Sequence, residues 1–593
     1  MNIHRSTRLS VALLALLSFG THAATPPDSQ PAPSAATPVA PTTAPTDAAP
    51  VAPSALPAAT PTATTGPAAA TPVAPTVPPV AAPAASQQDQ AAGESHQAPP
   101  AVATQPADAT PKEQAAAVAQ AASPGDPSGF RLMTLSTNAL LSRVSLADHA
   151  ERSIDMQYYI FRSDATGRLV ALHVLQAADR GVHVRILLDD LNLKEDVAMF
   201  QALDAHPNIE VRLFNPLRTR DPTAVSKAAQ FLLEFRRLNR RMHNKSFIVD
   251  NDEAVIGGRN IGDGYFDANA NNNFRDLDLL AIGPVVPAAT STFEAYWNSD
   301  AAHPLSEYHS KTHSDTGLAD LRATLEKNAR KFDASAYTQA ALDDLPNGAS
   351  ADRPGNWYWG PATLVADQPE KIVAESERGD LSIGPQLKTL INGAQSDVLL
   401  ISPYFVPGKR DEANFIALAQ RGVAVKVLTN SLASTDELAA HEGYSDHRRA
   451  LLKGGVQLFE LKPAPGVEMA ASDVGASSGV SLHAKSFVVD RRYVFIGSLN
   501  MDQRSKLLNT EMGVVVDSPQ LAKAVAEFFE TATSPANAYH VVLGARDGSH
   551  PTEMHWQASK DGKDVDYDSE PDATLRKRTE VLLLKLLPID GLL

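Results

Sequence analysis

Cysteine is absent from the 593 residues of this chain. That absence excludes disulfide scaffolds, thiol catalysis, cysteine-rich zinc sites and iron–sulfur clusters held by cysteine. Long apolar runs are missing too, since no stretch reaches the ~18 apolar residues that a membrane-spanning helix needs. Basic residues are in the minority, with 52 Lys and Arg against 68 Asp and Glu and a net charge of −16. Such a balance disfavours a protein that binds nucleic acid through bulk charge.

The N-terminus has the pattern of a secretory signal peptide over residues 1–23. Arg5 and Arg8 precede a short apolar run from Leu9 to Phe19, and small residues stand at the cleavage positions before Ala24. This pattern predicts export to the periplasm. Peripheral attachment to the membrane and an uncleaved signal anchor are the alternatives.

Proline and alanine dominate the next segment, 24–127. It holds more than half of the 43 prolines and few aromatic or large aliphatic residues. It therefore cannot bury enough apolar surface to offset the conformational entropy that ordering would cost. We expect this segment to be a disordered linker. The folded protein then divides into a first domain at 128–345 and a second at 346–593.

Two segments of the folded part repeat one pattern of strand, helix and strand. Both copies carry Arg-Gly-Val-x-Val where the helix meets the second strand, and glycine readily takes the left-handed conformation of a helix C-cap. Strand–helix–strand units with short connections imply parallel strands, so we expect an α/β fold of two similar halves. The predicted elements are 153–161, 168–180 and 181–189 in the first copy and 397–406, 414–421 and 422–429 in the second.

A second block also occurs twice, with the spacing His-x-Lys-x4-Asp. In both copies a glycine follows the histidine by fourteen residues and an asparagine follows it by seventeen. Identical spacing in two copies within one chain indicates a functional site. The residues are His243, Lys245, Asp250 and Asn260 in the first copy and His483, Lys485, Asp490 and Asn500 in the second.

Residues two apart on a strand project from the same face, so each His-x-Lys pair should place an imidazole beside an ammonium group. Two such pairs around one anion suit a phosphate diester, because one imidazole can attack phosphorus while the other protonates the leaving oxygen. The lysines and asparagines would hold the non-bridging oxygens. Asp250 and Asp490 would accept hydrogen bonds from the imidazoles. Because the lysines supply positive charge, we expect neither a metal nor a cofactor.

These motifs resemble the phospholipase D superfamily. Stretches such as YYIFRSDATGRL, RLNRRMHNKSFIVD, LHAKSFVVD and GSLNMDQRS resemble its bacterial cardiolipin synthase C branch, from near residue 130 to the C-terminus. The resemblance implies two pseudo-symmetric lobes, each a mixed β-sheet flanked by helices, with a shared central active site. It also implies a phosphatidyltransferase that forms cardiolipin through a phosphohistidine intermediate.

By the same resemblance, His243 is expected to be the nucleophile and His483 the general acid and base. Glu511 is a candidate to support a catalytic histidine, and Asp276 or Asp278 is its counterpart in the first copy. The residues expected to bind substrate are Asn260, Asn500, Ser498 and Glu511.

The implied partners are phospholipids at a membrane surface, with no nucleic acid expected and a monomer as the acting unit. Phosphatidylglycerol would be the acceptor, and phosphatidylglycerol or phosphatidylethanolamine the donor. The motif itself is neutral about the acceptor. A secreted phospholipase D that releases phosphatidic acid therefore stays open, as does a phosphodiesterase or nuclease.

Three further features have two interpretations each. The segments 231–242, with four arginines, and 575–593, with a run of leucines, suit contact with anionic headgroups but also ordinary helix packing. His441, Tyr444 and His447 could line the substrate cleft or lie at the surface.

Overall fold

The computed structural model describes residues 126–193, 196–216, 237, 239–308, 315–335, 357–373, 379–464, 479–550 and 552–585. The predicted signal peptide, nearly all of the Pro/Ala-rich segment and the predicted boundary between the two domains lie outside these residues. No helix within the described ranges is long and apolar enough to cross a membrane.

The first lobe contributes one half of a large mixed sheet. Its strands are β1 (Pro127–Met133), β2 (Ser153–Tyr158), β3 (His183–Asp189), β4 (Ile209–Phe214), β5 (Ser246–Val249), β6 (Glu253–Gly257), β8 (Asp278–Ile282) and β9 (Ala302–Pro304). Their order in space is β9–β4–β3–β2–β5–β6–β8–β1. The neighbours β2, β3 and β4 are parallel and the other pairs are antiparallel.

The second lobe repeats this arrangement. Its strands are β10 (Tyr358–Ala366), β11 (Asp397–Ile401), β12 (Ala424–Asn430), β13 (Gln457–Leu461), β15 (Ser486–Val489), β16 (Tyr493–Gly497), β17 (Met512–Asp517), β18 (Ala538–Leu543), β19 (Met554–Lys560) and β20 (Lys563–Tyr567). The order is β10–β17–β16–β15–β11–β12–β13–β18–β19–β20. From β10 to β13 it matches β1 to β4 strand for strand.

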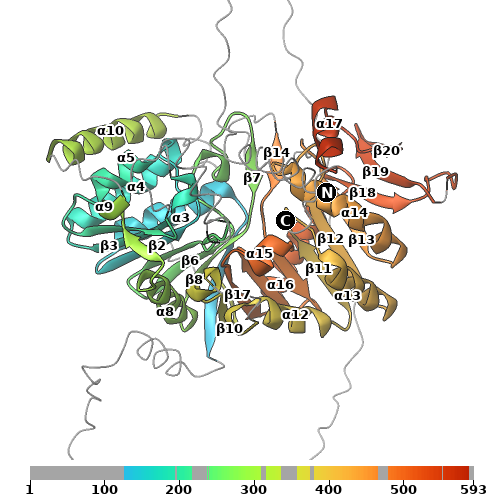
Figure 1. The fold of residues 1–593 in the computed structure, drawn as a ribbon, viewed down its shortest axis with the longest axis horizontal. Helices are drawn as coiled ribbons and strands as arrows, with labels where there is room; N and C mark the ends of the chain where they lie inside the picture. The colour runs from blue at the N-terminus through green and yellow to red at the C-terminus, as the bar shows by residue number, and fades with distance from the viewer. Residues whose placement is uncertain are drawn as a thin grey trace, which may run out of the picture. The chain divides into compact units, whose positions relative to one another are not determined.

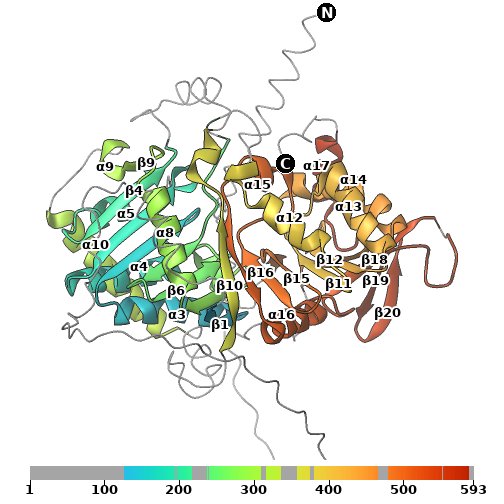
Figure 2. The same ribbon diagram turned by 90° about the horizontal axis from the view of Figure 1, so that it is seen from below.

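The two halves join at β1 and β10, which pair antiparallel with Phe130 opposite Tyr358. Figure 2 shows this pair at the middle of the sheet, between the blue-green first lobe and the orange second lobe. A second link is a small parallel pair made by β7 (Asn273–Arg275) and β14 (Val480–Leu482). β14 directly precedes His483 of the second motif, and β7 belongs to the first lobe, so this link brings the two lobes together beside the duplicated motifs (Figure 1).

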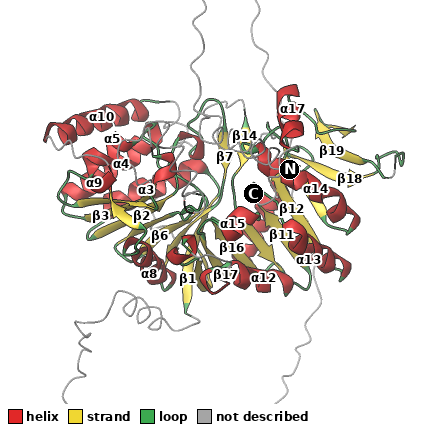
Figure 3. Cartoon of the chain, in the orientation of Figure 1, coloured by secondary structure: helices red, strands yellow, loops and turns green. Residues whose placement is uncertain are grey.

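Helices cover both faces of the sheet (Figure 3). On one face of the sheet, α8 and α16 pack on a single apolar core that extends across the seam between the lobes. Phe293 and Phe529 are both buried in it. The lobes have separate cores on the other face, under α3, α4 and α5 in the first and α13 and α14 in the second. The helices are α3 (Ser136–His149), α4 (Ala165–Asp179), α5 (Val197–Leu203), α8 (Val285–Trp297), α9 (Leu305–Tyr308), α10 (Asp315–Asp333), α12 (Gly384–Asn392), α13 (Gly408–Gln420), α14 (Leu438–Lys453), α15 (Gln503–Leu507), α16 (Pro519–Ala532) and α17 (Leu575–Leu584).

The repeated strand–helix–strand units are confirmed as β2–α4–β3 and β11–α13–β12. Gly181 and Gly422 have φ angles of 99° and 90°, the conformation expected of a glycine that ends a helix. Two strands end earlier than predicted, because Phe161 and Phe405 form isolated bridges to the segments that carry the motif asparagines. The predicted linker ends one residue too late, since Pro127 already belongs to β1.

Candidate active site

The His-x-Lys pairs lie in the extended segments that lead into β5 and β15, since each strand begins one residue after the lysine. The predicted strands therefore start one residue later than expected, after the lysine. Each lysine folds back on its own histidine. Lys245 Nζ donates to His243 O at 2.5 Å, and Lys485 Nζ donates to His483 O.

Each histidine is bound through its backbone to the opposite lobe. His243 N donates to Thr510 O at 2.9 Å. At the matching position of the second copy, His483 N donates to Arg275 O at 2.7 Å. Because of these two bonds, the residue after Thr510 lies beside the imidazole of His243. The residue after Arg275 lies beside the imidazole of His483 in the same way.

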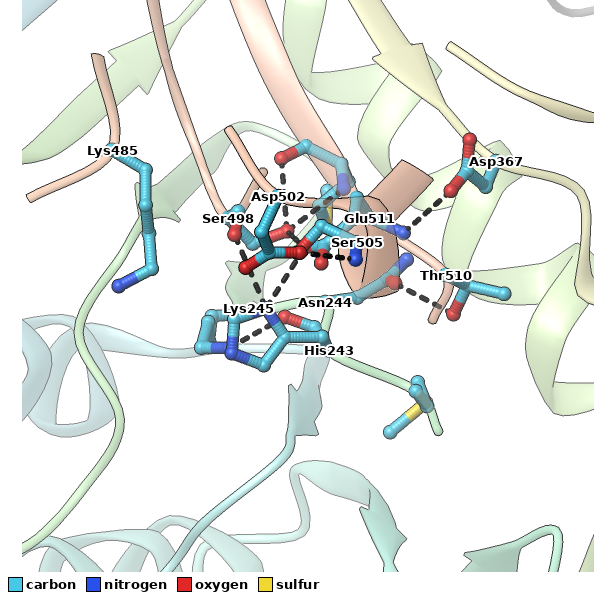
Figure 4. A network of polar contacts seen from close by, with 12 residues as sticks. His243, Asn244, Lys245, Asp367, Lys485, Ser498, Asp502, Ser505, Thr510 and Glu511 are labelled. Atoms are coloured by element: carbon cyan, nitrogen blue, oxygen red, sulfur yellow. Dashed lines mark hydrogen bonds and ion pairs between the residues drawn. The ribbon is translucent and has the colours of Figure 1, made fainter. Parts of the chain in front are cut away.

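The residues delivered in this way are Glu511 and Asp276. His243 Nδ1 lies 2.8 Å from Glu511 Oε2 and 3.1 Å from Ser498 O. His483 Nδ1 lies 2.5 Å from Asp276 Oδ2. Figure 4 shows Glu511 between His243 and Ser498. Each lobe thus supplies one imidazole and the carboxylate that orients the other lobe's imidazole.

These contacts set the tautomers and the charges. Because the partners of Nδ1 are acceptors, Nδ1 carries the proton and Nε2 keeps its lone pair. Burial, helped by Lys245 and Lys485, holds the pKa of His243 well below its usual value. Burial, helped by Lys485, also lowers the pKa of His483 to about 4. Burial alone would raise the pKa of Asp276, but the nearby His483 and Lys485 lower it to about 2. The free site therefore holds neutral imidazoles at neutral pH.

The two lysines give the site a positive charge that is nearly closed to water. Lys245 and Lys485 are each 1% exposed. Burial lowers the pKa of Lys485 to about 8. Burial, opposed by Glu511, and the neighbouring Lys485 hold the pKa of Lys245 well below its usual value. Two ammonium groups in this environment are stabilised by a bound anion, and a phosphate diester supplies one.

The residues that the sequence predicts to bind substrate differ from one another in their contacts. Asn260 Oδ1 accepts a hydrogen bond from Ile160 N at 3.2 Å, so its amide nitrogen is the end that can donate to a ligand. Asn500 is buried, with 4% of its surface exposed. Ser498 Oγ donates to Glu511 Oε2 at 2.5 Å. That contact makes Ser498 a positioning residue for Glu511 in this geometry.

The aspartates of the duplicated motif have a different role from the one predicted. Asp250 Oδ1 accepts from the backbone N–H groups of Arg152 and Ser153, both at 2.7 Å. Asp490 Oδ1 accepts from Ser396 N at 2.7 Å. The prediction that they accept from the imidazoles is wrong, because each lies beyond the far end of the short strand that separates it from the histidine. Asp250 binds the turn after β5 to the start of β2, and Asp490 binds the turn after β15 to the start of β11.

Two arginines of the basic segment before His243 make contacts within the chain, and residues 231–236 and 238 of that segment lie outside the described residues. Arg241 is 1% exposed and pairs with Asp190 Oδ1 at 2.9 Å. Arg240 donates to Ile372 O at 3.1 Å. The two arginines therefore anchor the entry to the motif.

Other candidate cleft residues make structural contacts. His441 Nε2 lies 2.9 Å from Glu570 Oε1, and His447 Nδ1 lies 2.5 Å from Glu412 Oε2. Both contacts tie α14 to its neighbours. Of the two candidate counterparts of Glu511, Asp278 pairs with an arginine of α3 at 2.9 Å and so is not the partner of a catalytic histidine.

Aromatic rings around the imidazoles were not predicted. The ring of Tyr159 lies edge-on to His243, with centroids 5.1 Å apart. Tyr265 and Phe274 lie 5.2 Å and 5.3 Å from the ring of His483. Tyr159 directly follows β2, so its place at a strand end was the only signal in the sequence.

Comparison with known proteins decides the family. The model described as "Cardiolipin synthase, PLD-like domain" matches residues 144–297 and 387–533, one match in each lobe. Cardiolipin synthase C of Escherichia coli (strain K12) is 38% identical over 469 residues, which cover 77% of this chain and 94% of the relative. The chain belongs to the phospholipase D-like cardiolipin synthase family.

More distant relatives agree with this placement. A cardiolipin synthase of Clostridium perfringens (strain SM101 / Type A) is 25% identical over 387 residues, 64% of this chain and 65% of that protein. Among solved structures, phosphatidylserine synthase of Haemophilus influenzae Rd KW20 has a TM-score of 0.50 at 13% identity, covering 78% of this chain and 95% of that one. At that identity the likeness shows the fold alone, and it confirms the predicted two-lobed phospholipase D architecture.

The glycine at position 258 makes room for the carboxylate of Asp276. A Cβ atom there would lie 2.3 Å from Asp276 Oδ1, far inside contact distance. Gly258→Ala should push the carboxylate away from His483 and lower kcat about 100-fold, since small displacements of catalytic groups have effects of that size. Steady-state turnover tests this, with thermal unfolding of the same sample to exclude loss of the fold. Gly393→Ala, where the nearest atoms lie at 3.4 Å, is the matched control. Full turnover in Gly258→Ala would contradict the assignment.

The acidic limb of the pH–rate profile should come from Glu511. Burial raises its pKa to about 7, although Lys245 opposes the shift. Below that pH the carboxyl is protonated and no longer offers an anionic acceptor to Nδ1 of His243. The rate of attack should then fall by about tenfold per pH unit toward acid. Single-turnover rates between about pH 5 and 9 test this. Glu511→Gln should be slower throughout and lack the limb near pH 7, and an unchanged limb in that variant would assign it to another group.

Proposed function

We propose that the protein is a phosphatidyltransferase that forms cardiolipin from phosphatidylglycerol, with phosphatidylglycerol or phosphatidylethanolamine as donor. The observation that carries this proposal is the exchange of carboxylates between the lobes, which prepares two neutral imidazoles around two buried lysines. Such a site suits double displacement at one phosphorus atom. The family relationship to cardiolipin synthase C supports a lipid as the substrate.

In the first step, Nε2 of His243 attacks the phosphorus of the donor lipid. A P–N bond forms, and the P–O bond to the headgroup breaks. His483 gives the leaving oxygen a proton from Nε2. A bound diester anion favours protonation of His483, and the ionised Asp276 stabilises the imidazolium that results.

In the second step, a hydroxyl group of phosphatidylglycerol replaces the headgroup. His483, now neutral, removes the hydroxyl proton, the new P–O bond forms, and the P–N bond to His243 breaks. The product is cardiolipin, and both histidines return to their starting states. Water in place of the lipid hydroxyl would give phosphatidic acid by the same step.

Charge on the phosphoryl oxygens is stabilised by Lys245 and Lys485 from opposite lobes. Their ammonium groups lie in a buried environment, where an electrostatic contact to the transition state is stronger than in water. The amide nitrogen of Asn260 can add a hydrogen bond. The mechanism therefore uses the chain's own cations at every step and needs no cofactor.

We also propose that the chain is exported through residues 1–23 and acts at a membrane surface as a monomer. The signal-like pattern of the sequence and the lipid substrates support this. Fractionation of cells that express the full chain, with a version starting at residue 24 as control, tests the export. Equal amounts of both versions in the cytosol would contradict it.

The proposed function is tested with the purified full chain and phosphatidylglycerol, with and without phosphatidylethanolamine, and with excess chelator in a parallel sample. Mass spectrometry of the products should show cardiolipin in all samples. Phosphatidic acid alone would favour a phospholipase D, and cleavage of DNA with no lipid product would favour a nuclease. Complete loss of transfer in chelator would refute the metal-free mechanism.

A further inference from the structure

A cavity of about 850 Å³ lies in the second lobe, outside the catalytic residues. Its walls are α12, α13 and α15, and α15 is the one nearest to the first lobe (Figures 1 and 2). The floor is apolar and includes Leu387, Phe415 and Leu499. A volume of this size fits a headgroup with the first part of its acyl chains.

The rim of this cavity is cationic. Among the described residues of the lining, Asp411 is the one acidic side chain, and it lies 3.3 Å from Lys388 and 2.5 Å from Lys506. Arg410 makes no ion pair with a described residue, and its side chain is exposed. An apolar floor under a positive rim is complementary to an anionic amphiphile. The basic residues of the lining are Arg240, Lys371, Lys388, Lys409, Arg410 and Lys506.

The cavity borders the segment that carries the motif asparagine of the second lobe. Leu499 and Met501 line it, and Asn500 stands between them. Lys371, on the opposite wall, donates to Asp367 Oδ2 at 2.6 Å, and the same oxygen accepts from Glu511 N at 2.9 Å. A molecule that touches Lys371 in the cavity would therefore be two contacts away from Glu511, and Figure 4 shows the second of these contacts, between Asp367 and Glu511.

We propose that this cavity binds the acceptor, a phospholipid with one phosphate anion, beside the catalytic site. This proposal rests on the proposed transferase function. A transferase that joins two lipids has to hold a second phosphate diester while the first is attached to histidine. The two lysines of the catalytic site are then engaged, so the second anion needs cations of its own. On the rim of the cavity Arg410 is such a cation, whereas the lysines at 371, 388, 409 and 506 are already paired with carboxylates.

The site decides how the covalent intermediate is divided between two acceptors. Lipid hydroxyl and water compete for the same P–N bond, and both reactions use the same histidines. Loss of the acceptor site lowers the rate constant for attack by the lipid hydroxyl and leaves the rate constant for attack by water unchanged. The ratio of cardiolipin to phosphatidic acid therefore reports on the cavity independently of the overall rate.

The experiment compares the full-length protein with Arg410→Glu and with the double variant Lys409→Glu/Arg410→Glu. Dihexanoyl phosphatidylglycerol in monomeric solution is the only lipid, so that general attraction to a charged bilayer has no part. We expect the ratio of cardiolipin to phosphatidic acid to fall about tenfold in the single variant, the effect of one charged hydrogen bond. The rate constant for attack by water should stay the same, so phosphatidic acid formation should not fall. The phosphatidylglycerol concentration that gives half-maximal cardiolipin formation should rise.

Two controls make the result specific. Lys523→Glu on α16 changes the same charge at a 78% exposed position outside the cavity and should keep the parental ratio. Arg410→Lys should restore most of it. A parental ratio in Arg410→Glu, an equal fall of both products, or an equal shift in Lys523→Glu would each overturn the acceptor site. Absence of cardiolipin from the unaltered protein would instead refute the proposed function.

Discussion

Replacing His243 by alanine should lower turnover by about 10⁵-fold to 10⁶-fold, the loss seen when a covalent nucleophile is removed from a catalytic unit. His483→Ala should reduce turnover of natural lipids by a similar factor, because the leaving oxygen and the acceptor hydroxyl both depend on its proton transfer. Product formation from phosphatidylglycerol, followed by mass spectrometry, measures both. Turnover near the parental rate in either variant would refute double displacement.

A donor with a good leaving group separates the two roles. Nitrophenolate needs no proton to leave, so a phosphatidyl nitrophenol should still react with His243 in the His483→Ala variant. The second step still needs a base, so the reaction should stop after a burst of nitrophenolate that matches the amount of protein. His243→Ala should show no burst. A burst in His243→Ala and none in His483→Ala would exchange the two assignments.

Much of the fold could be predicted from local patterns. The β-branched runs marked β2, β3, β11 and β12, and the Arg-Gly-Val junctions marked the glycines at positive φ. Duplication then implied two lobes with one architecture, as the matching strand orders confirm. The pairing of β1 with β10 at the seam could not be predicted, because it joins strands far apart in the sequence through backbone bonds that carry no residue signature.

Only some residues of the candidate site were predicted correctly from the sequence. Spacing found the histidines and lysines, because their types and their duplication indicate phosphoryl chemistry. The same spacing misled about Asp250. Asp250 follows His243 by seven residues, which span about 20 Å in extended conformation, so it cannot contact the imidazole unless the chain turns back. The short strand β5 runs straight between them, and the turn comes at Asp250 itself, which has a φ of 54°.

The true partners of the imidazoles come from exchange between lobes. Glu511 and Asp276 each follow a backbone carbonyl that binds the opposite motif, at Thr510 and Arg275. Sequence periodicity describes one lobe at a time, whereas this contact depends on how two lobes meet. Glu511 was nevertheless a candidate because it starts a strand that follows the motif asparagine, and that position proved to be the relevant one.

Asp276→Asn should lower kcat by about 10³-fold to 10⁴-fold with little change in KM. An amide keeps the size of the carboxylate but can present N–H to Nδ1 of His483, which would reverse the tautomer and remove the support for an imidazolium. The carboxylate is buried, accepts from Nδ1 of His483 and lies near the charge of Lys485, so no water can replace it. Steady-state kinetics and the pH profile measure the effect.

Asp250→Asn is the matched control, because it changes the aspartate of the duplicated motif itself. An asparagine Oδ1 can still accept from Ser153 N, so the turn should persist with a small loss of stability, about 1 kcal/mol, and near-parental kcat. If instead Asp250→Asn abolished turnover in a stably folded protein and Asp276→Asn did not, the motif aspartate would be the orienting group after all. Because the two substitutions are chemically identical, a difference in kcat between them measures the effect of the contact between Asp276 and His483.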